Sequence, residues 1–186
     1  GGDDTFATQT FTITVTAVND APVINAISDP SAILEDASAQ TISLFGIGDG
    51  DPEVAVTQGL TVTVASNNTS LIPTPTVTYT SDNATGSLVY TPVSDANGSA
   101  VITVTVADDG GIENSGVNST TRTFTVSVTA VNDEPSFTKG SDITVLEDSG
   151  SSTTSGWASS IVKGPSNESS QSVTFTLTNG NASLFS

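Results

Sequence analysis

The amino-acid sequence predicts an all-β protein built from tandem antiparallel β-sandwich modules. Several segments alternate an apolar residue with Thr or Ser, and this period of two is typical of half-buried strands. Short turn motifs rich in Asp, Asn and Gly separate those segments, and no segment shows a helical period. The decapeptides VTAVNDAPVI at 15–24 and VTAVNDEPSF at 128–137 indicate an internal repeat.

The repeat has a period of about 113 residues, which suits one sandwich domain and is too long for one coil of a solenoid. Residues 61–72 resemble residues 174–185 at an offset of 113. The tripeptide Leu34-Glu35-Asp36 recurs as Leu146-Glu147-Asp148 at an offset of 112. Three ordered matches at nearly one spacing indicate a duplicated module.

This period predicts an uneven division of the chain. We expect residues 1–20 to be the last strand of a preceding module, residues 21–133 to be a complete module and residues 134–186 to be the first half of a following module. The chain contains no Met, so we interpret it as an excerpt from a longer polypeptide. The strands of the half module should need a partner, because a few isolated strands are marginally stable.

The complete module should be an Ig-like antiparallel β-sandwich. Its expected strands are 22–27, 39–47, 60–65, 75–80, 86–91, 99–107 and 121–130. Seven short strands separated by acidic turns are typical of that fold. The outward positions of these strands are Thr and Ser with almost no Lys, so charge does not block pairing between strand edges.

The composition excludes several functions. Twenty acidic residues against three basic ones give a net charge of −17, which argues against binding nucleic acid or an anionic membrane surface. No apolar run approaches the roughly 18 residues that span a bilayer. The absence of Cys excludes disulfides and thiol catalysis, and without His a nucleophile lacks its usual base. We therefore expect no enzymatic activity.

The acidic turns are candidate calcium ligands. Calcium takes six to eight oxygens from carboxylates, carbonyls, amides and water, and several turns at one end of a sandwich could supply them. The candidates are Asn19, Asp20, Glu35, Asp36, Asp49, Asp51, Asp108, Asp109, Asn132 and Asp133. The alternative interpretation is that Asp and Asn occupy these turns only because they stabilise turn geometry.

Specific motifs carry a resemblance to a known family. The linker V-N-D-x-P-x-F resembles the linker between cadherin repeats, ADDGG at 107–111 is similar to the cadherin A-x-D-x-G motif, and DGD at 49–51 resembles its D-x-D pair. Together with LED, GWA at 156–158, GP-x-x-E at 164–168 and LFS at 184–186, the chain looks like the cadherin-like tandem repeats of giant bacterial surface proteins and adhesins.

The resemblance implies calcium ions between consecutive modules. The first joint would use Asn19, Asp20, Asp49, Asp51 and Asp108. The second would use Asn132 and Asp133 with Glu35 from the preceding module, and Glu147 would serve a third joint.

Two departures from the family pattern affect these expectations. GDGDPE at 48–53 is replaced by KGPSNE at 163–168, which keeps only Glu168 as an acid. We therefore expect the second joint to bind fewer ions, to bind them more weakly or to use carbonyl groups. The chain also lacks the cadherin D-R-E motif.

These observations predict a structural, calcium-stiffened module of a large extracellular surface protein or adhesin stalk. One alternative is a segment of a self-assembling filament, sheath or S-layer, whose partners would be identical chains. Another is a module that binds surface glycans or a partner protein through loops such as 110–120. Trp157, the only Trp, should anchor a core rather than stack on a sugar.

Overall fold

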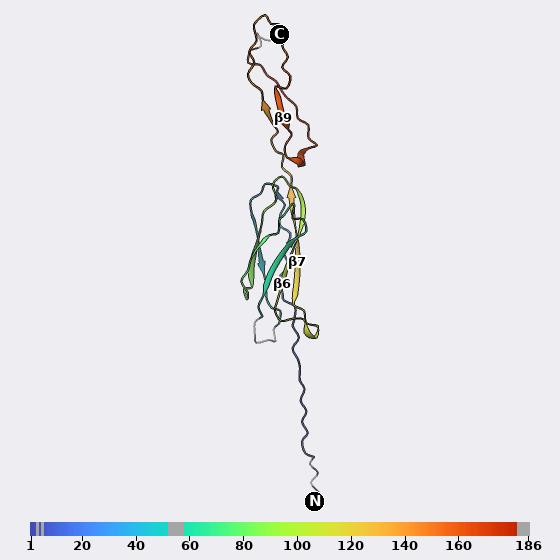
Figure 1. Ribbon diagram of the computed structural model, residues 1–186. Coiled ribbons are helices and arrows are strands. Elements are labelled where there is room, and N and C mark those ends of the chain that lie inside the picture. The colour runs from blue at the N-terminus through green and yellow to red at the C-terminus, as the bar shows by residue number, and fades with distance from the viewer. Residues whose placement is uncertain (3, 5, 52–57, 182–186) are drawn as a thin grey trace.

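The structure is a computed structural model that describes residues 1, 2, 4, 6–51 and 58–181. A β-sandwich lies in the middle, an extended N-terminal segment leaves it at one end and a smaller C-terminal unit follows at the other (Figure 1). The helical residues of the described part form two short 3₁₀ turns, Glu113–Ser115 and Ser166–Glu168. The prediction of an all-β sandwich protein is confirmed. Among the described residues, no helix is long and apolar enough to span a bilayer.

The sandwich consists of two sheets. The larger has the order β1-β7-β6-β3, with bounds Ile33–Leu34, Ser119–Thr129, Gly98–Ala107 and Thr61–Ser66. The smaller has the order β2-β5-β4, with bounds Gln40–Phe45, Thr85–Tyr90 and Thr76–Thr78. Every pair is antiparallel except β1 with β7, which run parallel with Ile33 opposite Val128.

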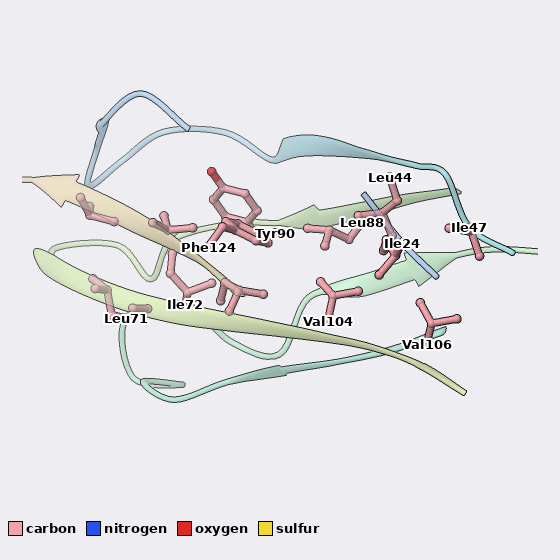
Figure 2. Close-up of a cluster of buried hydrophobic side chains, with 14 of the residues drawn as sticks. Ile24, Leu44, Ile47, Leu71, Ile72, Leu88, Tyr90, Val104, Val106 and Phe124 are labelled. Carbon is pink, nitrogen blue, oxygen red and sulfur yellow. The ribbon is translucent and has the colours of Figure 1, made fainter. Parts of the chain in front are cut away.

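The core lies between these sheets and follows the alternation of the sequence. On β6, Ile102 and Val104 are completely buried, whereas Val101 points outward and is 36% exposed. Leu44 and Leu88 of the smaller sheet belong to the same buried cluster (Figure 2). Burying each of these side chains contributes about 1.5–3 kcal/mol, so this cluster is the main stabilising element of the module.

The predicted strand at 22–27 is mostly wrong. The structure reduces it to an isolated bridge between Val23 and Gly48 and one hydrogen bond from Asn25 N to Phe45 O. Pro22 cannot donate to a ladder, and Pro30 follows shortly after on the way to the larger sheet, where Ile33–Leu34 forms β1 instead. The other six predicted strands agree with the observed ones to within about two residues at most ends.

The N-terminal segment is predicted to be the last strand of a preceding module, and that assignment stays a prediction. Residues 6–18 are extended, but no described residue pairs with them in a ladder. Phe11, Ile13 and Val15 are 85%, 75% and 88% exposed. A strand requires a neighbour for its backbone N–H and C=O groups, and this segment has none in the described structure.

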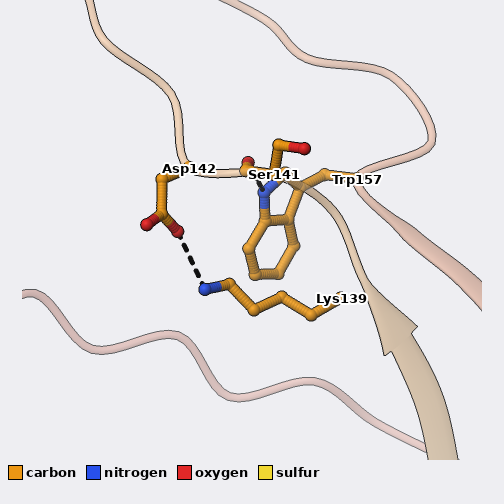
Figure 3. A network of polar contacts seen from close by, with 4 residues as sticks. All are labelled: Lys139, Ser141, Asp142 and Trp157. Atoms are coloured by element: carbon orange, nitrogen blue, oxygen red, sulfur yellow. Dashed lines mark hydrogen bonds and ion pairs between the residues drawn. The ribbon is translucent and has the colours of Figure 1, made fainter.

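The C-terminal unit contains a small sheet of β8, Ser136–Lys139, and β9, Ala158–Val162. Trp157 is half-buried beside this sheet, and its Nε1 donates to Ser141 O at 2.9 Å (Figure 3). Close by, Lys139 and Asp142 form an exposed ion pair at 2.8 Å. This hydrogen bond holds Trp157 within the unit, and its role as a core anchor stays a prediction.

Candidate metal centres at the two joints

The first joint lies where the linker residue Asn19 meets the loop between β6 and β7. Asn19 Nδ2 donates to Val117 O at 2.7 Å, to Asp108 Oδ1 at 3.0 Å and to Gly111 O at 3.2 Å. Its backbone O also accepts from Val117 N at 3.0 Å. Three acceptors around the nitrogen determine the orientation of this amide. Its Oδ1 therefore points away from them, and that oxygen is buried without a hydrogen-bond donor.

Asp108 contributes a second buried oxygen. The residue is only 8% exposed, and its Oδ1 accepts from Gly110 N at 3.0 Å, as an Asp in a turn usually does. Its Oδ2 is buried and has no donor. Turn geometry explains the environment of Oδ1 but not that of Oδ2. A buried carboxylate oxygen without a hydrogen-bond partner costs free energy.

Gln58 contributes a third oxygen, which the sequence did not predict. Its Nε2 donates weakly to Asp51 Oδ2 at 3.4 Å, and its Oε1 is buried without a donor. A Cβ on Gly110 would collide with Asn19 Oδ1 and would lie 2.6 Å from Gln58 Oε1. The two amide oxygens therefore converge over the bare backbone of Gly110. No sequence motif marks Gln58, since it follows the acidic loop by several residues.

The other predicted residues of this joint have different environments. Asp51 is 7% exposed and lies beside Gln58. Asp49 Oδ1 accepts from Asp51 N at 3.4 Å, within the same turn. Asp109 is exposed, and its Oδ1 accepts from Gly59 N at 2.9 Å. Asp20 is exposed. The structure thus brings Asn19, Asp51 and Asp108 together and leaves Asp20 and Asp109 at the surface.

The second joint connects the sandwich to the C-terminal unit through Glu35. This residue is completely buried, and its two oxygens accept from Val131 N at 2.8 Å and from Asn167 Nδ2 at 3.0 Å. Val131 follows β7, whereas Asn167 lies in the C-terminal unit. Glu35 therefore makes hydrogen bonds on both sides of the joint.

Glu168 mirrors Glu35 from the other side. It is 5% exposed, and its Oε1 accepts from Asp133 N at 2.8 Å. Its Oε2 is buried without a donor, and so is Asp133 Oδ2. Asn132 differs from Asn19, because its Oδ1 accepts from Gln171 Nε2 at 3.0 Å. The Asn-Asp pair of the linker thus uses different atoms at the two joints.

Three carboxylates gather at the second joint. One oxygen each from Asp36, Asp95 and Asp133 lies within 4.8 Å of the others, a spacing that would suit a shared cation. Partial burial raises the pKa of the Asp133 carboxyl, and the charges of nearby carboxylates, first of all Glu168, raise it further. Asp95 was not predicted. Its position in the loop before β6 could be found only by folding the chain.

Glu147 takes part in none of the hydrogen bonds at either joint. It is exposed and lies in a turn closed by Ser149 N and Leu146 O at 3.2 Å. Its predicted role at a third joint remains a prediction.

Both joints offer a donor set that suits a hard cation. Buried carboxylate and amide oxygens without donors are the ligand atoms that calcium takes in proteins. In a chain of net charge −17, a bound cation would also reduce the repulsion among these groups. The first joint combines amides with carboxylates, whereas the second is almost entirely carboxylate.

Fold and joints together define the class of the molecule: an all-β protein whose β-sandwich carries clustered carboxylate and amide oxygens at its two ends. No protein-family profile matches the chain, and no curated protein matches it.

The chain is similar to two solved structures over part of its length. Domains 4 and 5 of the S-layer protein SbsC match at 19% identity and a TM-score of 0.32, covering 57% of this chain and 53% of that one. The ZirS C-terminal domain matches at 14% identity and a TM-score of 0.34, covering 68% and 88%. The chain thus spans about half the length of the S-layer structure. Both similarities are too low to support a statement about function, and the cadherin-like resemblance stays a prediction.

Proposed function

We propose that this chain is a structural segment of an extracellular surface protein in which calcium stiffens the joints between tandem β-sandwich modules. The observation that carries the proposal is the first joint. There Asn19 Oδ1, Gln58 Oε1 and Asp108 Oδ2 come from three different segments and are all buried without donors. A divalent cation is the simplest partner for such a set.

A bound calcium ion would supply positive charge at this joint and would be coordinated by its oxygens. The residues of the chain orient the linker and supply the negative charge. Asn19 ties the linker to the loop between β6 and β7 by its three hydrogen bonds, so the linker direction is coupled to the geometry of that loop. Asp51 and Asp108 supply the negative charge in buried positions, where water screens it least.

The energetic effect can be estimated from general values. Extracellular calcium sites commonly have dissociation constants of about 0.1–1 mM. A concentration one hundred times the dissociation constant would stabilise the folded module by roughly 2.7 kcal/mol per site. This free energy is comparable to the stabilisation that one disulfide usually contributes, and the chain has no Cys to form one.

Gln58 provides the sharpest test. Its one hydrogen bond in the described structure is long, so Gln58→Ala should change the stability of the calcium-free chain by less than about 0.5 kcal/mol. If Gln58 Oε1 is a ligand, the same change should weaken calcium binding about tenfold in isothermal titration calorimetry. Gln40→Ala is the matched control, because Gln40 begins β2 and its Nε2 donates to Ser38 O, two residues before it. Equal calcium affinity of both variants and the unmodified chain would refute the assignment.

Self-assembly into a surface filament or layer is the second candidate function. The observation that favours it is the absence of charge on three edge strands, β2, β3 and β4, in a strongly acidic chain. Like-charged copies repel one another elsewhere, so these edges are the least unfavourable contacts between them. Sedimentation velocity over a hundredfold range of concentration tests this function, which predicts a sedimentation coefficient that rises with concentration. A constant monomer value would contradict it.

A further inference from the structure

We infer that the β3 edges of two copies of this chain pair with each other antiparallel, with Val64 of one copy opposite Val64 of the other. The inference rests on the assembly function proposed above and names the contact that carries it. All the residues that would pair belong to the sandwich, and none of them is a candidate cation ligand.

Three of the four sheet edges of the sandwich carry a feature that hinders pairing. At the edge of β2, Asn25 N already donates to Phe45 O at 3.0 Å, and Val23 forms a bridge with Gly48. β4 has three residues and directly follows Pro75, and β1 has two residues. Short strands, proline and covering segments are the usual protection of an edge. β3 has six residues without proline or charge, and among the described residues only β6 pairs with it.

The register of β3 with β6 identifies its free backbone groups. Asn67, directly after β3, donates from its backbone N to Val101 O at 3.1 Å. Hydrogen bonds alternate between the two sides of an antiparallel strand. Val62, Val64 and Ser66 therefore direct their N–H and C=O groups away from β6. Each of these three residues can bond to another strand at this edge.

A hollow lies beside the same edge. It has a volume of about 250 Å³, opens between β3 and β4, and is lined by Leu60, Thr61, Val62, Val77, Tyr79 and Ser81. Val62, Val64 and Val77 pack against the core but are only half-buried. A strand paired with β3 would continue the larger sheet past this opening. Its inward side chains would cover these apolar groups, and that burial favours association.

The positions of the acidic residues select the antiparallel arrangement. Asp109 lies at the start of β3, where its Oδ1 accepts from Gly59 N at 2.9 Å. The turn at the other end of β3, residues 67–70, carries no charge. A parallel pair would bring the Asp109 carboxylates of two copies together. An antiparallel pair instead places each Asp109 beside the uncharged turn of the partner, which reduces the repulsion between two acidic chains.

A second copy is the occupant that fits this edge. A twofold axis at Val64 pairs Val62 of each copy with Ser66 of the other and keeps both inward faces on the same side, so the two hollows adjoin. Such a contact closes on itself and produces dimers. TVTVA at 61–65 recurs as TFTLT at 174–178, so tandem modules would each offer this edge. Two chains could then pair at several modules at once, which multiplies a weak contact.

A single cysteine tests the register, because the chain contains no Cys. Directly opposed residues of an antiparallel pair have a Cα separation that a disulfide can span. After mild oxidation, Val64→Cys should therefore give a disulfide-linked dimer, and nothing larger, on a non-reducing gel. Ile42→Cys is the matched control, since Ile42 is also half-buried against the core and lies on the edge strand β2. Equal dimer yields from the two chains would overturn the register.

A pair of charges tests the contact itself. Thr63 and Ala65 are exposed on the outer face of β3, and in the proposed register Thr63 of each copy lies opposite Ala65 of the other. Thr63→Asp combined with Ala65→Asp places two like-charge pairs across the contact. In sedimentation velocity, this variant should associate about tenfold more weakly than the unmodified chain. Thr121→Asp with Thr123→Asp adds the same charge to exposed positions of β7, is the matched control and should associate like the unmodified chain.

The same experiment separates this contact from assembly in general. Association that is as strong in the β3 variant as in the β7 control would overturn the β3 contact and leave assembly through other edges. An unmodified chain that stays monomeric would overturn both the contact and the assembly function.

Discussion

The hydrogen bonds of Glu35 predict that one side chain couples the sandwich to the C-terminal unit. Glu35→Gln keeps an acceptor for Val131 N but places an NH₂ group against Asn167 Nδ2, where only donors then face each other. The bond across the joint is lost, which should cost about 1.5 kcal/mol for a charged acceptor. Glu35→Ala loses both bonds and leaves the Val131 N–H without its partner, so we expect about 3 kcal/mol.

The two halves of this prediction can be observed separately. Trp157 lies in the C-terminal unit, so its fluorescence reports unfolding of that unit, whereas far-UV circular dichroism is dominated by the sandwich. In urea with chelator present, Glu35→Gln should shift the fluorescence transition and leave the circular dichroism transition in place. Glu35→Ala should shift both, and its melting temperature should fall by about 12 °C at roughly 4 °C per kcal/mol.

A double-mutant cycle with Asn167→Ala completes the test. If Glu35 and Asn167 interact as the structure has it, the cost of Glu35→Gln should almost vanish in the Asn167→Ala background, giving a coupling free energy of about 1–1.5 kcal/mol. A coupling below about 0.3 kcal/mol would refute the direct contact across the joint.

Two further predictions concern the core and the acidic cluster. Ile102→Ala should destabilise the sandwich by about 2–5 kcal/mol in urea unfolding, whereas Val101→Ala on the outer face of the same strand should cost much less; equal costs would contradict the alternation of β6. The pKa of Asp133 is raised in the folded chain, so the folded state binds the Asp133 proton more tightly than the unfolded state does. The contribution of Asp133 to stability is therefore greatest at low pH and is lost as pH rises through the folded pKa. In chelator, Asp133→Asn should raise the melting temperature at neutral pH, and the melting temperature should depend less on pH above about 4. An unchanged pH profile would count against the electrostatic origin of the pKa shift.

The alternation of Thr with Val or Ile was sufficient to predict most of the fold. It identified β6 and β7 almost to the residue, because their inward positions face one continuous core and their outward positions face solvent. It did not identify β1, since two residues in a parallel pair leave no detectable period. It also overestimated the strand around Ile24, where one buried apolar side chain in an irregular segment gives the same local pattern as a strand.

The joints could be predicted only in part. Asn19 and Glu35 lie in recurring motifs, so the repeat itself identified them, and Asp108 was identified by the acidic turn ADDGG. Gln58 and Asp95 lie in loops without a motif, and only the tertiary fold brings them to the joints. Predicting such residues from sequence requires knowing which loops meet, which depends on the sheet order rather than on local pattern.

The position of β7 has a mechanical consequence. The chain enters the sandwich at Asn19, whose side chain is bonded to the loop just before β7, and leaves it directly after β7 at the other end (Figure 1). Tension along the chain would pull β7 lengthwise against β6, to which it is paired from Gly98 to Ala107. The hydrogen bonds of this long pair would then share the load together instead of opening one after another. Forced unfolding depends on the rate of crossing that barrier, so resistance to pulling in this module would reside in one strand rather than in its total stability.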